Sequence, residues 1–160
     1  STLFPYTTLF RSLADRKGCC NGLLIGGNLS VLSAMIGTPY LQTSAQALFF
    51  VEDINEPPYR IDRMLSHLGN AGLLSNSRGV LFGQFSREPG EEAKDSRDDL
   101  RLEKIVEYYS RLLPAGSPVM RGLSYGHIRN LLTIPVGGKF KLTVTDSAFL
   151  LQALEPVVEE

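Results

Sequence analysis

One stretch, residues 47–68, constrains the fold more than any other. It begins with the apolar run ALFFV at residues 47–51, which is typical of a short strand buried in an α/β sheet. The carboxylates Glu52 and Asp53 follow at once. Open α/β sheets usually place their chemistry where buried strands end, so these two side chains are candidates for a site.

The same stretch continues into an amphipathic helix. Ile61, Met64, Leu65 and Leu68 are spaced i, i+3, i+4 and i+7, which puts them on one apolar face. The prolines at 57–58 suit the first helical turn, where the missing N–H would have no partner inside the helix. The stretch therefore predicts a strand, a carboxylate-bearing end and a helix that packs back on the sheet.

Length and charge narrow the classes of protein. With 160 residues the chain fits one domain, and its net charge of −1 comes without a basic stripe that would indicate nucleic acid. The apolar runs are far shorter than the roughly 20 residues that span a bilayer. Cys19 and Cys20 are adjacent, which is neither a disulfide framework nor metal-site spacing, so a reducing compartment fits best.

The first twelve residues, STLFPYTTLFRS, show no clear helical or strand period and no signal-peptide pattern. They resemble translated adapter or library sequence. We expect residues 1–12 to be a foreign leader or, alternatively, a disordered one, and residues 13–160 to form the domain.

Further elements are expected along the chain. A strand is expected at residues 22–28, followed by a helix that Asn28 or Ser30 caps. A second buried strand is expected at residues 79–83. Residues 86–99 predict a charged surface loop, and a second helix with apolar positions from Leu102 to Leu113 follows. Short strands are expected at 119–120, 132–134, 139–145 and 149–154, with a hairpin turn at Asp146-Ser147. Together these predict an α/β fold with a mixed sheet flanked by helices and a β-rich C-terminal end.

The chain has two histidines, and one of them is a catalytic candidate. His67 lies on the polar side of the first helix and is most simply a surface residue, whereas His127 follows Gly126 at a predicted strand end. An imidazole suits a general base at physiological pH, and a carboxylate on its other nitrogen would orient it. Glu52 is the candidate carboxylate. The alternative is a capping carboxylate and an unrelated loop histidine.

Two other kinds of site are less well supported. Residues 122–126 read Gly-Leu-Ser-Tyr-Gly, the nucleophile-elbow pattern, but little room for a helix follows Ser124 before Pro135, and His127 comes too soon. Glu52, Asp53, Glu56 and His127 could bind a hard divalent ion, yet no ligand motif supports a metal site. Arg60 and Arg63 are placed to pair with Glu56.

Several short segments then match the pattern of one family in order. They are Gly26-Gly27-Asn28-Leu29, Ile36-Gly37-Thr38-Pro39, residues 51–57 with Tyr59-Arg60 and Arg63-Met64-Leu65, Ala71-Gly72, Gly83-Gln84-Phe85, Gly122-Leu123 with Gly126-His127, and Ile134-Pro135-Val136-Gly137. On these segments the chain resembles, over roughly residues 22–154, the C-terminal part of the LD-carboxypeptidases. These are the muramoyltetrapeptide carboxypeptidase family of serine peptidases, which includes microcin C self-immunity proteins.

The resemblance implies a Ser–Glu–His triad in which Glu52 is the glutamate and His127 the histidine. It further implies cytoplasmic release of the terminal D-alanine from murein tetrapeptides in cell-wall recycling, no metal or organic cofactor, no nucleic-acid or membrane partner, and a homodimer. The family's serine and oxyanion hole lie in an upstream α/β domain that matches nothing before Gly22, so we expect this chain alone to be inactive. A microcin C immunity-type peptidase and a non-catalytic peptide-binding or dimerisation module stay open as alternatives.

Overall fold

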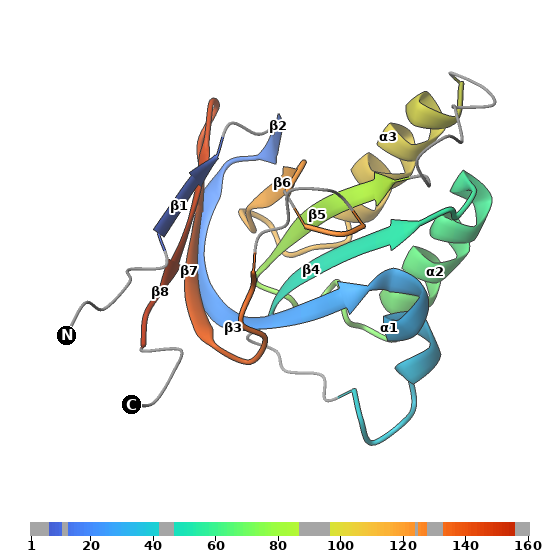
Figure 1. Cartoon of the computed structure of the whole chain (residues 1–160), viewed down its shortest axis with the longest axis horizontal. Coiled ribbons are helices and arrows are strands. Elements are labelled where there is room, and N and C mark those ends of the chain that lie inside the picture. The colour runs from blue at the N-terminus through green and yellow to red at the C-terminus, as the bar shows by residue number, and fades with distance from the viewer. Residues whose placement is uncertain are drawn as a thin grey trace.

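The structure, a computed structural model, describes residues 7–10, 13–41, 47–86, 97–123, 125–127 and 133–155. The described residues form one mixed sheet of eight strands and three helices (Figure 1). The strands are β1 (Thr7–Phe10), β2 (Leu13–Arg16), β3 (Gly18–Asn28), β4 (Ala47–Ile54), β5 (Gly79–Ser86), β6 (Val119–Arg121), β7 (Lys139–Val144) and β8 (Phe149–Ala153), and the helices are α1 (Leu29–Met35), α2 (Pro58–Asn70) and α3 (Arg97–Ser110).

The sheet has a parallel centre and antiparallel sides. Its strand order is β1-β8-β7-β3-β4-β5-β6-β2, with β3 to β6 parallel to one another. The long strand β3 belongs to both parts, because residues 18–23 pair antiparallel with β7 and residues 23–28 pair parallel with β4. The predicted α/β class, with a mixed sheet and a β-rich C-terminal end, is confirmed.

Strand β4 lies at the centre of the molecule and separates two apolar clusters. Phe49 and Val51 face the cluster that the helices cover, whereas Leu48 and Phe50 face the cluster formed with β7 and β8. Figure 1 shows β3 bending so that β7, β8 and β1 turn away from the three helices. Because both faces of β4 are covered, its sequence is a continuous apolar run instead of an alternating one.

The first predicted helix is confirmed as α2. Ile61, Leu65 and Leu68 are buried, Met64 is partly buried against them, and Pro58 occupies the first turn. The helix ends before Gly72, whose φ of +77° is the left-handed conformation that glycine adopts without strain.

Some expectations differ from the structure. Leu112 is 41% exposed, because α3 ends at Ser110 and the helical period does not continue past it. Thr133 and Ile134 lie in no strand, since the adjacent Pro135 has no N–H for a ladder. Residues 7–10, for which we expected no regular structure, form β1 paired with β8. Of the predicted loop at 86–99, Ser86 ends β5 and residues 97–99 begin α3. Residues 87–96 of that loop, and Leu132, lie outside the described residues.

Candidate active site

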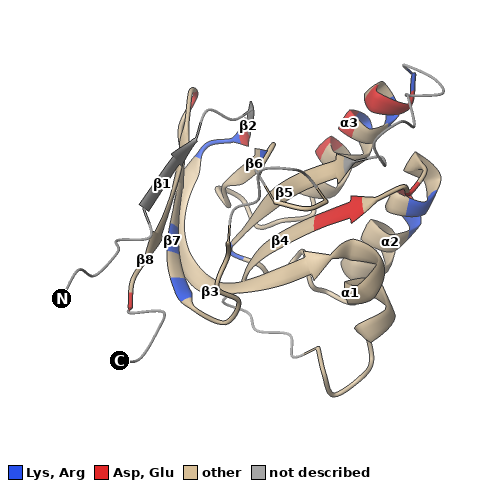
Figure 2. Ribbon diagram, in the orientation of Figure 1, with Lys and Arg blue, Asp and Glu red and all other residues tan. Residues whose placement is uncertain are grey.

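The candidate site lies at the end of β4. Glu52 and Asp53 belong to the strand, which continues to Ile54 and so extends further than its apolar run. Both carboxylates are buried. The neighbouring strands β3 and β5 carry no charged residue that could form an ion pair with them (Figure 2). Burying a carboxylate is costly unless hydrogen bonds compensate it, so the partners of these two groups define the site.

The loop that carries His127 is attached to β5. The N–H of Leu123 donates to the carbonyl of Phe82 at 3.2 Å, and the N–H of Gln84 donates to the carbonyl of Tyr125 at 3.0 Å. The β4–β5 ladder is irregular here, with two residues of β5 opposite Glu52 alone. Such irregularities change the direction of the strand residues next to them. Here the irregularity lies where the His127 loop crosses the end of β5 toward Glu52.

Glu52 and His127 are in direct contact. Nδ1 of His127 lies 3.0 Å from Oε2 of Glu52, whose side chain is 5% exposed while the histidine's is 51% exposed. An Nδ1–H that donates to the carboxylate would leave Nε2 as the ring nitrogen that carries the lone pair. The predicted contact is therefore present, in the arrangement that an acid–base pair requires; its catalytic role stays a prediction.

Two glycines lie against Glu52, and because they have no side chain they leave room for its carboxylate. A Cβ on Gly126 would lie 2.8 Å from Oε2 of Glu52, and the φ of this glycine is +121°. A Cβ on Gly83 would lie 3.0 Å from Cβ of Glu52 and 2.7 Å from the carbonyl oxygen of Tyr125. Side chains at either position would displace the carboxylate or the loop.

Asp53 does not face the histidine but holds the start of α1. Its Oδ2 accepts from the N–H and the hydroxyl of Ser30 at 2.9 and 2.7 Å, and its Oδ1 accepts from Nδ2 of Asn28 at 2.9 Å and from the N–H of Ile54 at 2.9 Å. Asn28, and not Ser30, is the N-cap of α1. An anion at a helix N-terminus is favourable, which accounts for a buried aspartate without a basic partner in these contacts.

Tyr125 forms an apolar wall beside the pair. Its ring meets that of Phe50 edge to face, with centroids 4.9 Å apart. Burial and, to a smaller extent, the negative charge of Glu52 raise the pKa of the Tyr125 phenol. The carboxylate charge therefore acts in an environment that water does not fully screen.

The remaining sequence candidates lie elsewhere or outside the description. Ser124 is not among the described residues, and His67 is exposed on α2. Glu56 pairs with Arg60 at 3.3 Å, as the spacing predicted. Within the described part of the chain no three His, Cys, Asp or Glu side chains are grouped so as to hold a metal, and no helix is long and apolar enough to cross a bilayer.

Sequence reasoning missed the link between Asn28 and the two carboxylates. In the parallel ladder Asn28 lies opposite Glu52, so the three polar side chains come together only once the register of β3 and β4 is known. The available signal was a polar residue near the end of each of two predicted strands, at Asn28 and at Glu52.

Comparison with known proteins places the chain in a family. Residues 21–142 match the LD-carboxypeptidase C-terminal domain. A probable murein peptide carboxypeptidase of Bacillus subtilis (strain 168) is 35% identical over 153 residues, which are 95% of this chain and 46% of that protein. The chain thus spans about half the length of this curated relative.

Solved structures agree with that placement. The crystal structure of muramoyltetrapeptide carboxypeptidase from Oxalobacter formigenes shares 30% identity with a TM-score of 0.78, over 93% of this chain and 50% of that one. The microcin C7 self immunity protein MccF shares the fold, with a TM-score of 0.65 at 18% identity over 96% of this chain and 42% of that one. The chain therefore belongs to the LD-carboxypeptidase family and contains its C-terminal domain.

Proposed function

We propose that this chain supplies the general base and its orienting acid to a serine LD-carboxypeptidase that releases the terminal D-alanine of murein tetrapeptides. The observation that carries the proposal is the 3.0 Å contact between the buried Glu52 carboxylate and Nδ1 of His127. Murein peptide carboxypeptidases among the relatives support the substrate class. The proposed enzyme acts in cytoplasmic cell-wall recycling as a homodimer, without a cofactor and without nucleic-acid or membrane partners.

In the proposed mechanism the His127 ring transfers the proton, and Glu52 orients that ring. Nε2 takes the proton of a serine hydroxyl as Oγ bonds to the carbonyl carbon of the L–D peptide bond. The imidazolium, stabilised by Glu52, then gives that proton to the departing amine of D-alanine as the C–N bond breaks. Water hydrolyses the acyl-enzyme with His127 again acting as the base.

The serine in this proposal, together with the oxyanion-hole donors, belongs to protein outside these 160 residues. Loss of the nucleophile from a triad costs on the order of 10⁶ in kcat. We therefore expect the purified 160-residue chain to release no D-alanine above the blank. Release near the rate of a full-length enzyme would instead point to a nucleophile within the chain, Ser124 first among the candidates.

The test is made in the full-length protein. Glu52→Gln keeps the shape of the side chain but removes its charge, and should lower kcat on the order of 10⁴-fold, as for the carboxylate of other triads. His127→Ala should lower it at least as much, whereas His67→Ala, the matched control on α2, should leave it unchanged. D-Alanine release from murein tetrapeptide is the measurement, with circular dichroism to verify folding.

Unchanged turnover in Glu52→Gln and His127→Ala would exclude both residues from the triad. It would favour a module that binds peptide or mediates dimerisation. A full-length protein that cleaves a microcin-like peptidyl nucleotide but not murein tetrapeptide would contradict the proposed substrate. It would support an immunity-type peptidase that uses the same pair of residues.

A further inference from the structure

Asn28 connects the two buried carboxylates at the end of β4. Its Nδ2 donates to Oδ1 of Asp53 at 2.9 Å and lies 3.4 Å from Oε1 of Glu52, the oxygen that does not face His127. The two oxygens of Glu52 thus have different partners, one the histidine and the other the amide. A carboxylate held at both oxygens has little freedom to rotate.

The orientation of the Asn28 amide follows from its other contact. Its Oδ1 accepts from the N–H of Val31 at 3.1 Å, in the first turn of α1. An amide has one acceptor end and one donor end, so with its oxygen at the helix its NH₂ group must face the carboxylates. The helix cap therefore fixes which atoms Asn28 presents to Glu52.

Asp53 completes this arrangement from the opposite side. Its four hydrogen bonds come from Asn28, from the backbone and hydroxyl of Ser30, and from Ile54. Two neighbouring carboxylates in a buried setting repel each other, and the NH₂ group of Asn28 is the donor that both share. It therefore reduces their repulsion and ties Glu52 to a rigid strand–helix junction.

We propose that Asn28 is a positioning residue for the acid–base pair: through its NH₂ group it holds Glu52 in the rotamer that keeps the proton of His127 on Nδ1. This rests on the proposed function, and it adds a role beyond helix capping. The competing interpretation is that Asn28 is an N-cap and nothing more, in which case its NH₂ group is dispensable.

Asn28→Ser separates the two roles. Serine is a good N-cap, so this variant keeps the cap of α1, but its short side chain offers no amide to Glu52. Asn28→Asp is the second variant, since it also keeps the cap and lacks the NH₂ group. Ser30→Ala is the matched control, because it removes a donor from Asp53 and none from Glu52.

The main measurement is the tautomer of His127, read from its ring ¹⁵N chemical shifts at neutral pH in this 160-residue chain. The chain has two histidines, so the exposed His67 is an internal reference. We expect the wild type and Ser30→Ala to keep the proton on Nδ1. Asn28→Ser and Asn28→Asp should shift the population toward the Nε2–H form, in the direction of the shift that Glu52→Gln produces.

The second measurement is kinetic and uses the full-length protein. Removal of a group that orients a functional side chain typically costs about 10- to 100-fold, so Asn28→Ser should lower kcat by this factor and change KM by less than about twofold. A wild-type tautomer together with wild-type kcat in Asn28→Ser would overturn the proposal. The tautomer shift does not depend on catalysis, so it would still support the positioning role if Glu52→Gln and His127→Ala retained activity.

Discussion

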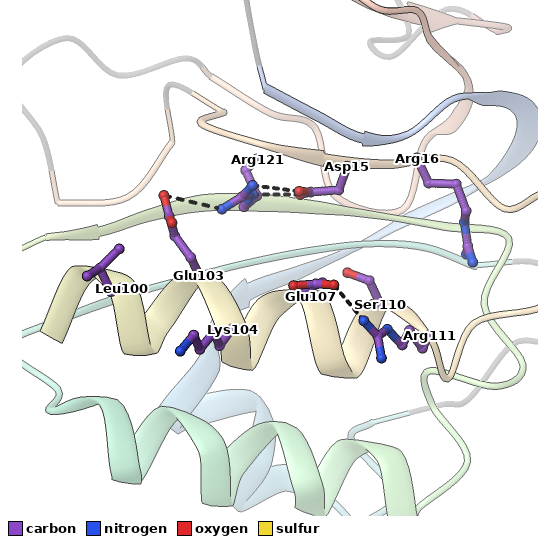
Figure 3. A pocket seen from close by; sticks show the side chains of 9 residues that line it. All are labelled: Asp15, Arg16, Leu100, Glu103, Lys104, Glu107, Ser110, Arg111 and Arg121. Atoms are coloured by element: carbon purple, nitrogen blue, oxygen red, sulfur yellow. Dashed lines mark hydrogen bonds and ion pairs between the residues drawn. The ribbon is translucent and has the colours of Figure 1, made fainter. Parts of the chain in front are cut away.

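The molecule has two charged regions that differ in how their acids are compensated. In the cluster between α3 and β2–β6, every acid pairs with an arginine: Asp15 and Glu103 with Arg121, and Glu107 with Arg111 (Figure 3). At the end of β4, Glu52 and Asp53 instead accept from an amide, a hydroxyl, backbone N–H groups and the His127 ring. The acids of the first region are paired with arginines, whereas those of the second have neutral donors and one histidine as partners.

In the proposed function, this difference separates a structural cluster from a reactive site. The ion pairs of the α3 cluster join β2 and β6 to the helix, because Asp15 on β2 and Glu103 on α3 both pair with Arg121 on β6. A cavity of about 560 Å³ lies in that cluster, and neither Glu52 nor His127 lines it. Neutral donors orient a carboxylate without cancelling it, and Glu52 can therefore stabilise an imidazolium. The proposed catalytic pair thus lies outside this cavity and is distinguished by the partners of its carboxylate.

Among the variants that test this difference between the two regions, Gly126→Ala at the end of β4 has the largest expected effect. Its Cβ would meet Oε2 of Glu52 at 2.8 Å, so the carboxylate or the His127 loop must move. A misplacement of about 1 Å costs about 10²-fold in rate, and we expect that loss in kcat of the full-length protein. Gly116→Ala is the matched control, since it also has a positive φ (+78°) but an open Cβ position.

Gly116→Ala should lose about 1 kcal/mol of stability from backbone strain, measured by urea unfolding, and Gly126→Ala should lose more because its Cβ also meets Glu52. Only Gly126→Ala should lose activity. Equal activity in the two variants would show that the fit of the carboxylate against Gly126 has no part in turnover.

The second prediction concerns the ion pairs of the α3 cluster. Arg121→Met removes both contacts to Asp15, at 2.7 Å each, from a pair whose side chains are 26% and 13% exposed. Leaving a mostly buried carboxylate without its partner should cost about 2 kcal/mol of unfolding free energy, while kcat of the full-length protein stays unchanged.

Arg111→Met is the control for that prediction. Its pair with Glu107 is exposed on both sides, and such pairs contribute about 0–1 kcal/mol. A drop in kcat for Arg121→Met, with Arg111→Met normal, would mean that the α3 cluster acts on catalysis, and the contrast between the two regions would fail.

The smallest effect concerns the pH dependence of stability near the site. Burial and the charge of Glu52 raise the pKa of Tyr125 in the folded chain. Below about pH 9 the phenol is neutral in both states and contributes no pH dependence. As the pH rises further, the unfolded chain loses the proton first, so stability falls until the folded pKa is passed.

Tyr125→Phe should therefore reduce the loss of unfolding free energy between about pH 9.5 and 11. Tyr40→Phe, whose ring is 81% exposed, is the control and should keep the wild-type slope. Urea unfolding at several pH values measures both. Identical slopes in the wild type and Tyr125→Phe would show that the phenol is not shielded beside Glu52.

The parts of the fold that the sequence predicts are those with a strong local period. The apolar run of β4 and the stripe of Ile61, Leu65 and Leu68 on α2 are local patterns, and both are found in the structure. The contact between Glu52 and His127 was predictable because the end of a buried strand and a short list of histidines leave few pairings. The family resemblance, which rests on ordered short motifs, is confirmed.

The rest depends on long-range pairing, which no local pattern encodes. The position of Asn28 beside Glu52 follows from the register of β3 against β4. The additional β5 residue opposite Glu52 follows from the way the His127 loop attaches to β5. The pairing of residues 7–10 with β8 joins opposite ends of the sequence, and a weak strand signal could not predict it.

The central position of β4 has a consequence for the order in which the domain opens. Amide hydrogens exchange with solvent through local openings that start at weakly held edges, and here the outer strands are β1 and β2. Strand β4 is buried along its length between two parallel neighbours, so its amides should be among the last to exchange. We therefore expect the proposed catalytic acid to be carried by one of the most persistent segments of the sheet, so that fraying of the outer strands leaves its surroundings in place.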